Sequence, residues 1–263
     1  MSRIPQIFES ARAEGRKLLM PFMCAGSPRP GLLGEQLAVL ERAGASIVEI
    51  GIPFSDPIAD GPVIAEAMHI ALESGVSPGK VFEEVRACRE QTSLGLVAMV
   101  SVSIVHRMGG PSGFARLAAE AGFDGLIVPD CPFQEAEALT AAGREAGVTV
   151  SHLISPSTPS ERAGRIAQAS SGFVYLLARA GITGERSDAP DIEAPVRAIR
   201  ESSEVPIACG FGISTAEHVR AVVEHADAAI VGSALVRRMA DSQDPIRDLE
   251  TFTSELVQGL RAE

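Results

Sequence analysis

A glutamate inside an apolar run is the first side chain of this sequence with an evident chemical use. Glu49 is surrounded by valine, isoleucine and glycine in the stretch 48–51. Burial disfavours the charged form of a carboxyl and raises its pKa toward values that suit acid–base catalysis. The alternative is a strand glutamate on an outer face, paired with an arginine. We favour the first reading and predict that Glu49 is a general acid or base.

The loop after Glu49 contains two further acids. Asp56 and Asp60 lie in residues 52–62, a stretch that also holds three prolines. Proline fixes φ and restricts a loop, so the acids would be presented at fixed positions. Asp60 could accept a hydrogen bond from a substrate N–H, whereas Asp56 could equally be a turn former.

The chain has a single tyrosine, Tyr175, in the apolar run 172–177. A buried phenol needs a polar partner, so we predict a place in a pocket, with core packing as the alternative. The loop that follows is long and holds small residues, which suits a lid.

Two glycine turns indicate a phosphate site. Gly212 and Gly232 each follow an apolar run and precede a helical pattern, Ser233 comes directly after Gly232, and Gly184 lies in the loop after Tyr175. Backbone N–H groups and helix N-termini can hold a phosphate dianion without lysine. Two plain strand-to-helix turns are the alternative.

Eight short apolar runs alternate with amphipathic segments and provide the frame for these residues. Such runs are typical of parallel strands buried on both faces. Eight βα units in 263 residues predict an α/β protein with a (β/α)8 barrel, in one domain of residues 1–263. An open, doubly wound sheet is the alternative. The predicted strands cover residues 18–24, 46–51, 94–100, 124–128, 148–153, 172–177, 205–209 and 228–231.

Helical patterns fill most of the gaps between these runs. Capping patterns at Thr158 and Ser214 predict two helix starts, and Gly44, Gly122 and Gly147 predict helix ends. An extra N-terminal helix and additional helices are expected outside the regular repeat. The helical patterns cover residues 33–43, 113–121, 135–146, 159–169 and 216–225, and the additional ones 4–14, 63–73 and 244–261.

Charge and residue composition exclude several classes of function. The net charge of −11 argues against a nucleic-acid partner. The two lysines, Lys17 and Lys80, fall outside predicted strand ends, which excludes a Schiff-base aldolase. The five histidines lack metal-ligand spacing, so we expect neither a metal nor a cofactor.

The remaining features concern location. Four separated cysteines predict free thiols rather than a disulfide framework. The first residues lack the apolar core of a signal peptide, and no run approaches the roughly 20 residues of a membrane span. We therefore expect a cytoplasmic protein without a membrane partner.

The sequence resembles the tryptophan synthase alpha subunit family over essentially its whole length. The most specific match is the fourteen-residue stretch from Glu49 to residue 62. The other matching stretches are 21–22 with 25–28, 124–130, 155–159, 170–175, 181–184, 210–213 and 232–234.

The resemblance implies a (β/α)8 barrel that cleaves indole-3-glycerol phosphate to indole and glyceraldehyde 3-phosphate, usually beside a pyridoxal-phosphate beta subunit in an αββα assembly. Glu49 would be the acid/base at the glycerol hydroxyl and indole C3, and Asp60 would stabilise the indole N–H. The other implied residues are Tyr175 and Thr183 beside these two, Phe22, Ile127, Leu153 and Phe211 as walls of the indole slot, and Gly184, Gly212, Gly232 and Ser233 at the phosphate.

One stretch departs from the family pattern. After the third predicted strand the family has a sequence like M-x-Y-x-N-P, whereas this chain reads M-V-S-V-S-I at residues 99–104. The family uses this stretch to line the pocket and to face the beta subunit. An ordinary alpha subunit is our first prediction, and a stand-alone lyase that releases indole is the alternative, with weakened or absent beta binding. A phosphate-barrel isomerase and a non-catalytic partner barrel are the remaining readings.

Overall fold

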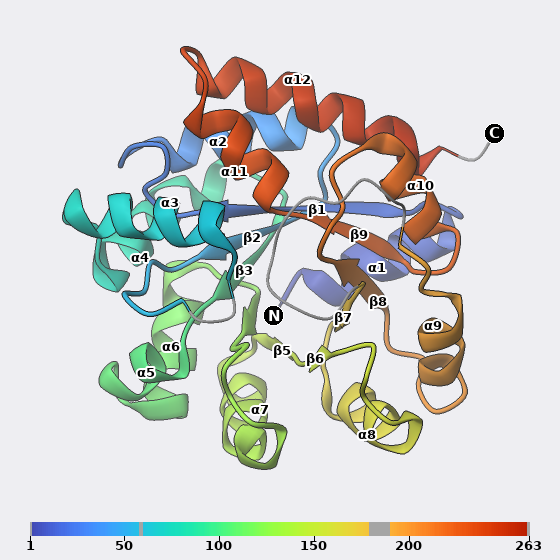
Figure 1. Cartoon of the computed structure of the whole chain (residues 1–263). Coiled ribbons are helices and arrows are strands. Elements are labelled where there is room, and N and C mark those ends of the chain that lie inside the picture. Colours follow the sequence, from blue (N-terminus) through green and yellow to red (C-terminus); the bar gives the residue numbers. More distant parts are fainter. Residues whose placement is uncertain (1, 58–59, 179–189, 262–263) are drawn as a thin grey trace.

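The chain folds into a parallel barrel surrounded by helices (Figure 1). The computed structural model describes residues 2–57, 60–178 and 190–261. All paired strands are parallel, in the order β5-β4-β3-β2-β1-β9-β8-β7-β6. The strands are β1 (Leu18–Cys24), β2 (Ile47–Gly51), β3 (Gly95–Met99), β4 (Gly125–Ile127), β5 (Thr149–Ser151), β6 (Leu153–Ile154), β7 (Val174–Leu177), β8 (Ile207–Gly210) and β9 (Ala228–Val231).

The nine strand segments form eight barrel strands, as predicted. β5 and β6 are two parts of one strand that is interrupted at His152. The backbone N–H of His152 donates to Ser170 Oγ at 3.2 Å, while its carbonyl accepts from Tyr175 N at 3.0 Å. A side-chain acceptor has therefore taken the place of one ladder carbonyl, and the chain itself closes the ring between β5 and β6.

Helices follow the strands and cover the outside of the barrel (Figure 1). Repeated βα units place the C-terminal strand ends, and the loops that follow them, on one rim. The helices are α1 (Ile4–Ala13), α2 (Leu33–Arg42), α3 (Pro62–Glu73), α4 (Pro78–Cys88), α5 (Val102–Arg107), α6 (Gly110–Ala121), α7 (Ala136–Ala146), α8 (Ser160–Ala169), α9 (Glu193–Arg200), α10 (Ala216–Val223), α11 (Ser233–Ala240) and α12 (Pro245–Val257).

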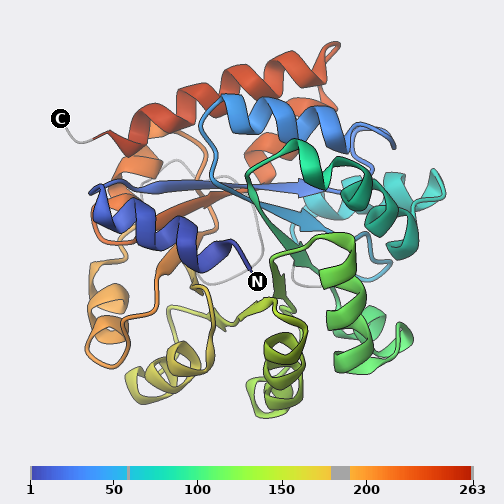
Figure 2. The ribbon, with the colours of Figure 1, turned by 180° about the vertical axis from the view of Figure 1, so that it is seen from behind.

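Strand alternation separates two apolar layers. On β2, Ile47 packs with the barrel interior, whereas Val48 and Ile50 pack in the larger layer between the sheet and the helices. Helix α1 contributes Ile4 and Phe8 to the interior cluster, so it closes one end of the barrel. Figure 2 shows α1 lying across that end. The opposite end remains for the site.

The structure corrects several predicted boundaries. The helix α8 begins at Ser160 and has no side-chain cap among the described residues, so the start at Thr158 was wrong. Helix α10 is capped by Thr215, whose hydroxyl accepts from His218 N, and not by Ser214. Gly44, Gly122 and Gly147 do end helices with positive φ, as expected. The predicted helical ranges leave out α4, α5, α9 and α11, although the glycine turn at Gly232 did predict a helix start where α11 begins.

Among the helices of the described residues, none has the length and apolar character that a membrane span requires.

Candidate active site

Glu49 points into the barrel from the middle of β2. It lies between Phe22 of β1 and Val97 of β3 in the strand register, and its side chain is on the same face as Ile47. It is fully buried, and neither carboxyl oxygen has a hydrogen-bond partner among the described residues. Desolvation raises the pKa of Glu49 well above its ordinary value. The alternative of an outer-face glutamate paired with an arginine is therefore wrong.

Asp60 follows Glu49 in the loop that leads to α3. Its backbone N–H donates to Pro57 O at 3.0 Å, which fixes the position of Asp60 relative to Pro57. Burial raises the pKa of Asp60 to about 6, so its charge changes near neutral pH. Asp56 is exposed and its carboxylate accepts from Ser55 Oγ at 2.7 Å, consistent with a local turn.

Tyr175 faces the barrel interior from β7. Burial raises the pKa of its phenol well above the ordinary value, and the charges of Glu49, Cys209 and Asp60 raise it further. The phenol therefore stays protonated and can act as a hydrogen-bond donor. Its ring meets the edge of the Phe211 ring, with centroids 6.3 Å apart.

A glycine on the neighbouring strand provides the space for this ring. A Cβ on Gly210 would lie 2.9 Å from Tyr175 Cζ, closer than such atoms approach. Tyr175 and Gly210 come from adjacent, paired strands. The absence of a side chain at residue 210 therefore sets the depth at which the phenol lies.

The predicted walls of an apolar slot surround the same region. Ile127, Leu153 and Phe211 belong to the interior cluster that contains Tyr175. Phe22 is buried in an adjoining cluster near the start of α3, and its ring occupies space that a Cβ on Gly51 would invade, at 2.5 Å from Cζ. The four wall residues thus come from four different strands or strand ends, which is typical of a barrel pocket.

The two glycine turns occupy neighbouring strand ends. Phe211 and Gly212, after β8, have φ values of 81° and 78°. Phe211 is the one non-glycine residue with positive φ in the described chain, and such strain is found preferentially at functional sites. Gly232 precedes Ser233, the first residue of α11, so the N–H groups of that helix start face the rim. Thr183 and Gly184 lie outside the described residues.

A hydrogen-bonded pair that sequence reasoning missed lies on the same rim. Ser101 Oγ donates to Asp130 Oδ2 at 2.7 Å, and Val102 N donates to Asp130 Oδ1 at 2.8 Å. Ser101 is also the N-cap of α5, where its hydroxyl accepts from Ser103 N. Residues 99–104, which depart from the family pattern, therefore form a capped helix start. The sequence contained one local indication of this helix start, namely a serine at residue 101 followed by a short stretch that can form a helix.

A small cavity connects this pair with the acid loop. It has a volume of about 40 Å³, and its lining includes Asp60, Met99, Ser101 and Asp130. In the described part of the chain, no group of three or more histidine, cysteine or acidic side chains could hold a metal ion. Of the predicted catalytic residues, Glu49 and Asp60 provide two carboxyls with raised pKa and Tyr175 provides a protonated phenol.

The fold and this rim define a (β/α)8 barrel protein with a fully buried carboxyl, Glu49, and a less buried acid, Asp60, at the site. The model of the family described as tryptophan synthase alpha chain matches residues 8–262. The chain belongs to the tryptophan synthase alpha chain family.

Relatives and solved structures agree with this membership. The tryptophan synthase alpha chain of Synechococcus sp. (strain CC9902) is 46% identical, over 92% of this chain and 90% of its own. That of Solibacter usitatus is 38% identical, over 100% and 99%. Among solved structures, Mycobacterium tuberculosis tryptophan synthase matches with a TM-score of 0.91, 33% identity and coverage of 100% and 99%. The alpha subunit from Legionella pneumophila matches with a TM-score of 0.90, 33% identity and coverage of 99% and 98%.

Proposed function

We propose that this chain cleaves indole-3-glycerol phosphate to indole and glyceraldehyde 3-phosphate. The observation that carries the proposal is the carboxyl of Glu49, which is fully buried inside the barrel with neither oxygen hydrogen-bonded among the described residues. Burying a carboxyl without a hydrogen-bond partner costs folding free energy. A polar group of the bound substrate that pairs with this carboxyl explains why it is there. Family membership supports this reaction over a sugar-phosphate isomerase or a non-catalytic barrel.

The reaction needs one proton delivered and one removed. Protonation of indole C3 converts the ring to an indolenine cation, and loss of the proton from the hydroxyl of the adjacent glycerol carbon then breaks the C–C bond. The bonding electrons return to the ring, and the oxygen becomes the aldehyde of glyceraldehyde 3-phosphate. Glu49 is placed for this exchange, because a carboxyl with a raised pKa is effective both as acid and as base.

Asp60 acts on the ring nitrogen in this proposal. As the indolenine forms, positive charge develops on the N–H, and the ionised carboxylate of Asp60 accepts a hydrogen bond from it. A pKa of about 6 leaves Asp60 mostly ionised at neutral pH. Tyr175, protonated and beside Glu49, supplies a donor that orients the reacting groups. Thr183 completes this set as the family match implies.

The rest of the substrate meets two kinds of surface. Phe22, Ile127, Leu153 and Phe211 provide the apolar slot for the indole ring. The glycerol phosphate lies at the two glycine turns, where Gly212, Gly232 and Ser233 offer backbone N–H groups, together with Gly184 as the family match implies. No cofactor has a part in the proposal.

We also propose that a tryptophan synthase beta subunit is the partner. The names of the matching relatives favour this enzyme over the stand-alone lyase. The partner would contact the rim that contains the Ser101–Asp130 pair. The family's aromatic, asparagine and proline are missing there, so the contact would use the capped start of α5 instead.

Indole release from indole-3-glycerol phosphate by the purified chain, alone and with a beta subunit, tests both proposals. Slow release that rises sharply with the partner is the expected result. Rapid release that ignores the partner would favour the stand-alone lyase. Absence of release in both conditions would refute the proposed reaction.

A further inference from the structure

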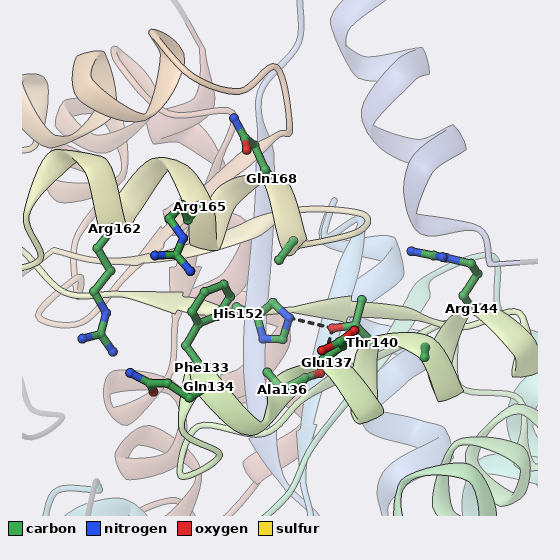
Figure 3. Close-up of a pocket in the computed structure, with 12 residues that line it drawn as sticks. Phe133, Gln134, Ala136, Glu137, Thr140, Arg144, His152, Arg162, Arg165 and Gln168 are labelled. Atoms are coloured by element: carbon green, nitrogen blue, oxygen red, sulfur yellow. Dashed lines mark hydrogen bonds between the residues drawn. The ribbon is translucent and has the colours of Figure 1, made fainter.

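A second pocket lies outside the barrel, between α7 and α8. Its volume is about 660 Å³, and it is formed by the facing sides of these helices and by the segment that leads into α7. Figure 3 shows His152 near the centre of the pocket with Phe133 beside it, Arg165 above Phe133, and Arg162 and Gln134 farther to the left. None of these residues has a part in the proposed reaction.

His152 reaches this pocket because it interrupts the fifth barrel strand. The next residue, Leu153, packs with the barrel interior, so the imidazole is directed to the outer side. The interruption is maintained by the hydrogen bond from His152 N to Ser170 Oγ. A half-buried histidine is thereby placed at the floor of an otherwise helical groove.

The hydrogen bonds of Thr140 determine which ring nitrogen of His152 carries the proton. The Thr140 hydroxyl donates to Ala136 O at 3.0 Å, and it lies 3.0 Å from His152 Nε2. A hydroxyl has one hydrogen, so Thr140 must accept from Nε2–H. Burial lowers the pKa of His152, which favours the neutral ring. Nδ1 is then an unprotonated acceptor, and it has no hydrogen-bond partner among the described residues.

The lining of the pocket carries more positive than negative charge, because three arginines, Arg144, Arg162 and Arg165, lie there with one acid, Glu137. Arg162 and Arg165 are three residues apart on α8 and therefore share one face of that helix. Neither guanidinium makes an ion pair or a hydrogen bond within the described part of the chain, although the protein carries a net charge of −11. Unpaired guanidiniums bind carboxylates well because their donors form a planar fork.

The third feature is an aromatic wall. Phe133 meets the His152 ring edge to face, with centroids 5.9 Å apart and an interplanar angle of 81°. A flat ring placed against Phe133 would complete an aromatic cluster of a favourable kind. Its polar substituents would then meet the imidazole at the floor and the guanidiniums at the rim.

We propose that this pocket binds an aromatic carboxylate that carries an O–H or N–H donor at the end of the ring away from its carboxylate. The donor hydrogen-bonds to His152 Nδ1, the carboxylate binds Arg162 and Arg165, and the ring packs on Phe133. The site is separate from the active site, because the wall of the barrel lies between them. It is independent of the proposed reaction.

Calorimetric titration of the full chain with 4-hydroxybenzoate tests the proposal, with benzoate and phenol as matched probes. Benzoate lacks the donor and phenol lacks the carboxylate, so each should bind at least tenfold more weakly. The double variant Arg162→Ala/Arg165→Ala should weaken 4-hydroxybenzoate at least tenfold. Arg86→Ala, an exposed arginine on α4, is the control and should leave the Kd unchanged.

Two further measurements distinguish this pocket from the active site. Binding should perturb the imidazole ¹⁵N shift of Nδ1 in histidine-labelled protein and should persist in Asp60→Asn. His152→Leu should weaken 4-hydroxybenzoate to the level of benzoate, and unchanged indole release would show that this variant is folded. Loss of binding in Asp60→Asn with retention in the arginine variant, or no binding to wild type at millimolar probe, would overturn the proposal.

Discussion

The substitution Asp60→Asn should make the protein more stable at neutral pH while it abolishes most of the activity. Burial raises the pKa of Asp60 from 3.8 to about 6. A folded-state pKa above the unfolded value means that the stabilising contribution is complete below pH 3.8 and is lost as pH rises through about 6. At pH 7.5, ionised Asp60 therefore lowers the stability of the wild type, and asparagine does not.

The shift of roughly two pKa units corresponds to at most about 3 kcal/mol, at 1.36 kcal/mol per unit. The side chain keeps some exposure, so solvent screening places the measured value below this ceiling. For a chain of this length, about 1 kcal/mol changes Tm by roughly 2–4 °C. We expect the variant to unfold several degrees above wild type at pH 7.5, with a clearly smaller difference in Tm at pH 4.5, where only part of the destabilisation is present.

Urea unfolding of both proteins between pH 4.5 and 8 is the assay. Glu49 is present in both proteins, so its own titration cancels in the difference. A difference in unfolding free energy that is constant with pH would refute the reasoning. A wild-type kcat/KM that fails to fall as pH is lowered through about 6 would contradict the ionised role of Asp60.

Three further outcomes are expected. Glu49→Gln should reduce kcat by a factor of about 10³ or more with the fold intact, and unchanged indole release would contradict the proposed function. Gly210→Ala should displace the phenol of Tyr175 and reduce kcat/KM at least tenfold, because its Cβ would lie 2.9 Å from Cζ; Tyr175→Phe provides the comparison, and a fully active Gly210→Ala would disprove the positioning argument. Asp130→Ala should lower the unfolding free energy by about 1–3 kcal/mol, through loss of the bonds from Ser101 and Val102 N, and should weaken beta-subunit binding in a pull-down; identical melting curves would count against it.

Much of the architecture could be predicted because it depends on local patterns. Continuous apolar runs mark strands with two buried faces, and each of the eight runs contains a barrel strand. No predicted range covered α4, although Ser77 caps it and its apolar residues have helical spacing, so the signal was present in the sequence. The start of α8 was wrong because Thr158 instead accepts a hydrogen bond from Ser155 N within its own loop.

Less of the candidate site than of the fold could be predicted from the sequence. The direction of Glu49 follows from strand alternation, since Ile47 shares its face. The fit of Tyr175 over Gly210, and the Ser101–Asp130 pair, join residues that are far apart in the chain. The interruption at His152 depends on Ser170, which arrives with the end of α8. Such contacts form only when the helices and strands have assembled, so no local sequence pattern predicts them.

The pairing of the first strand with the last has a consequence for how the chain is made. β1 is hydrogen-bonded to β9, with Leu18 opposite Ala228. During synthesis from the N-terminus, one edge of β1 therefore stays open until almost the whole chain has left the ribosome. Unpaired strand edges associate readily with other chains, and contacts between distant residues form slowly. We therefore expect this protein to be most prone to aggregation during synthesis, before the barrel closes. A chaperone would have its largest effect at that stage.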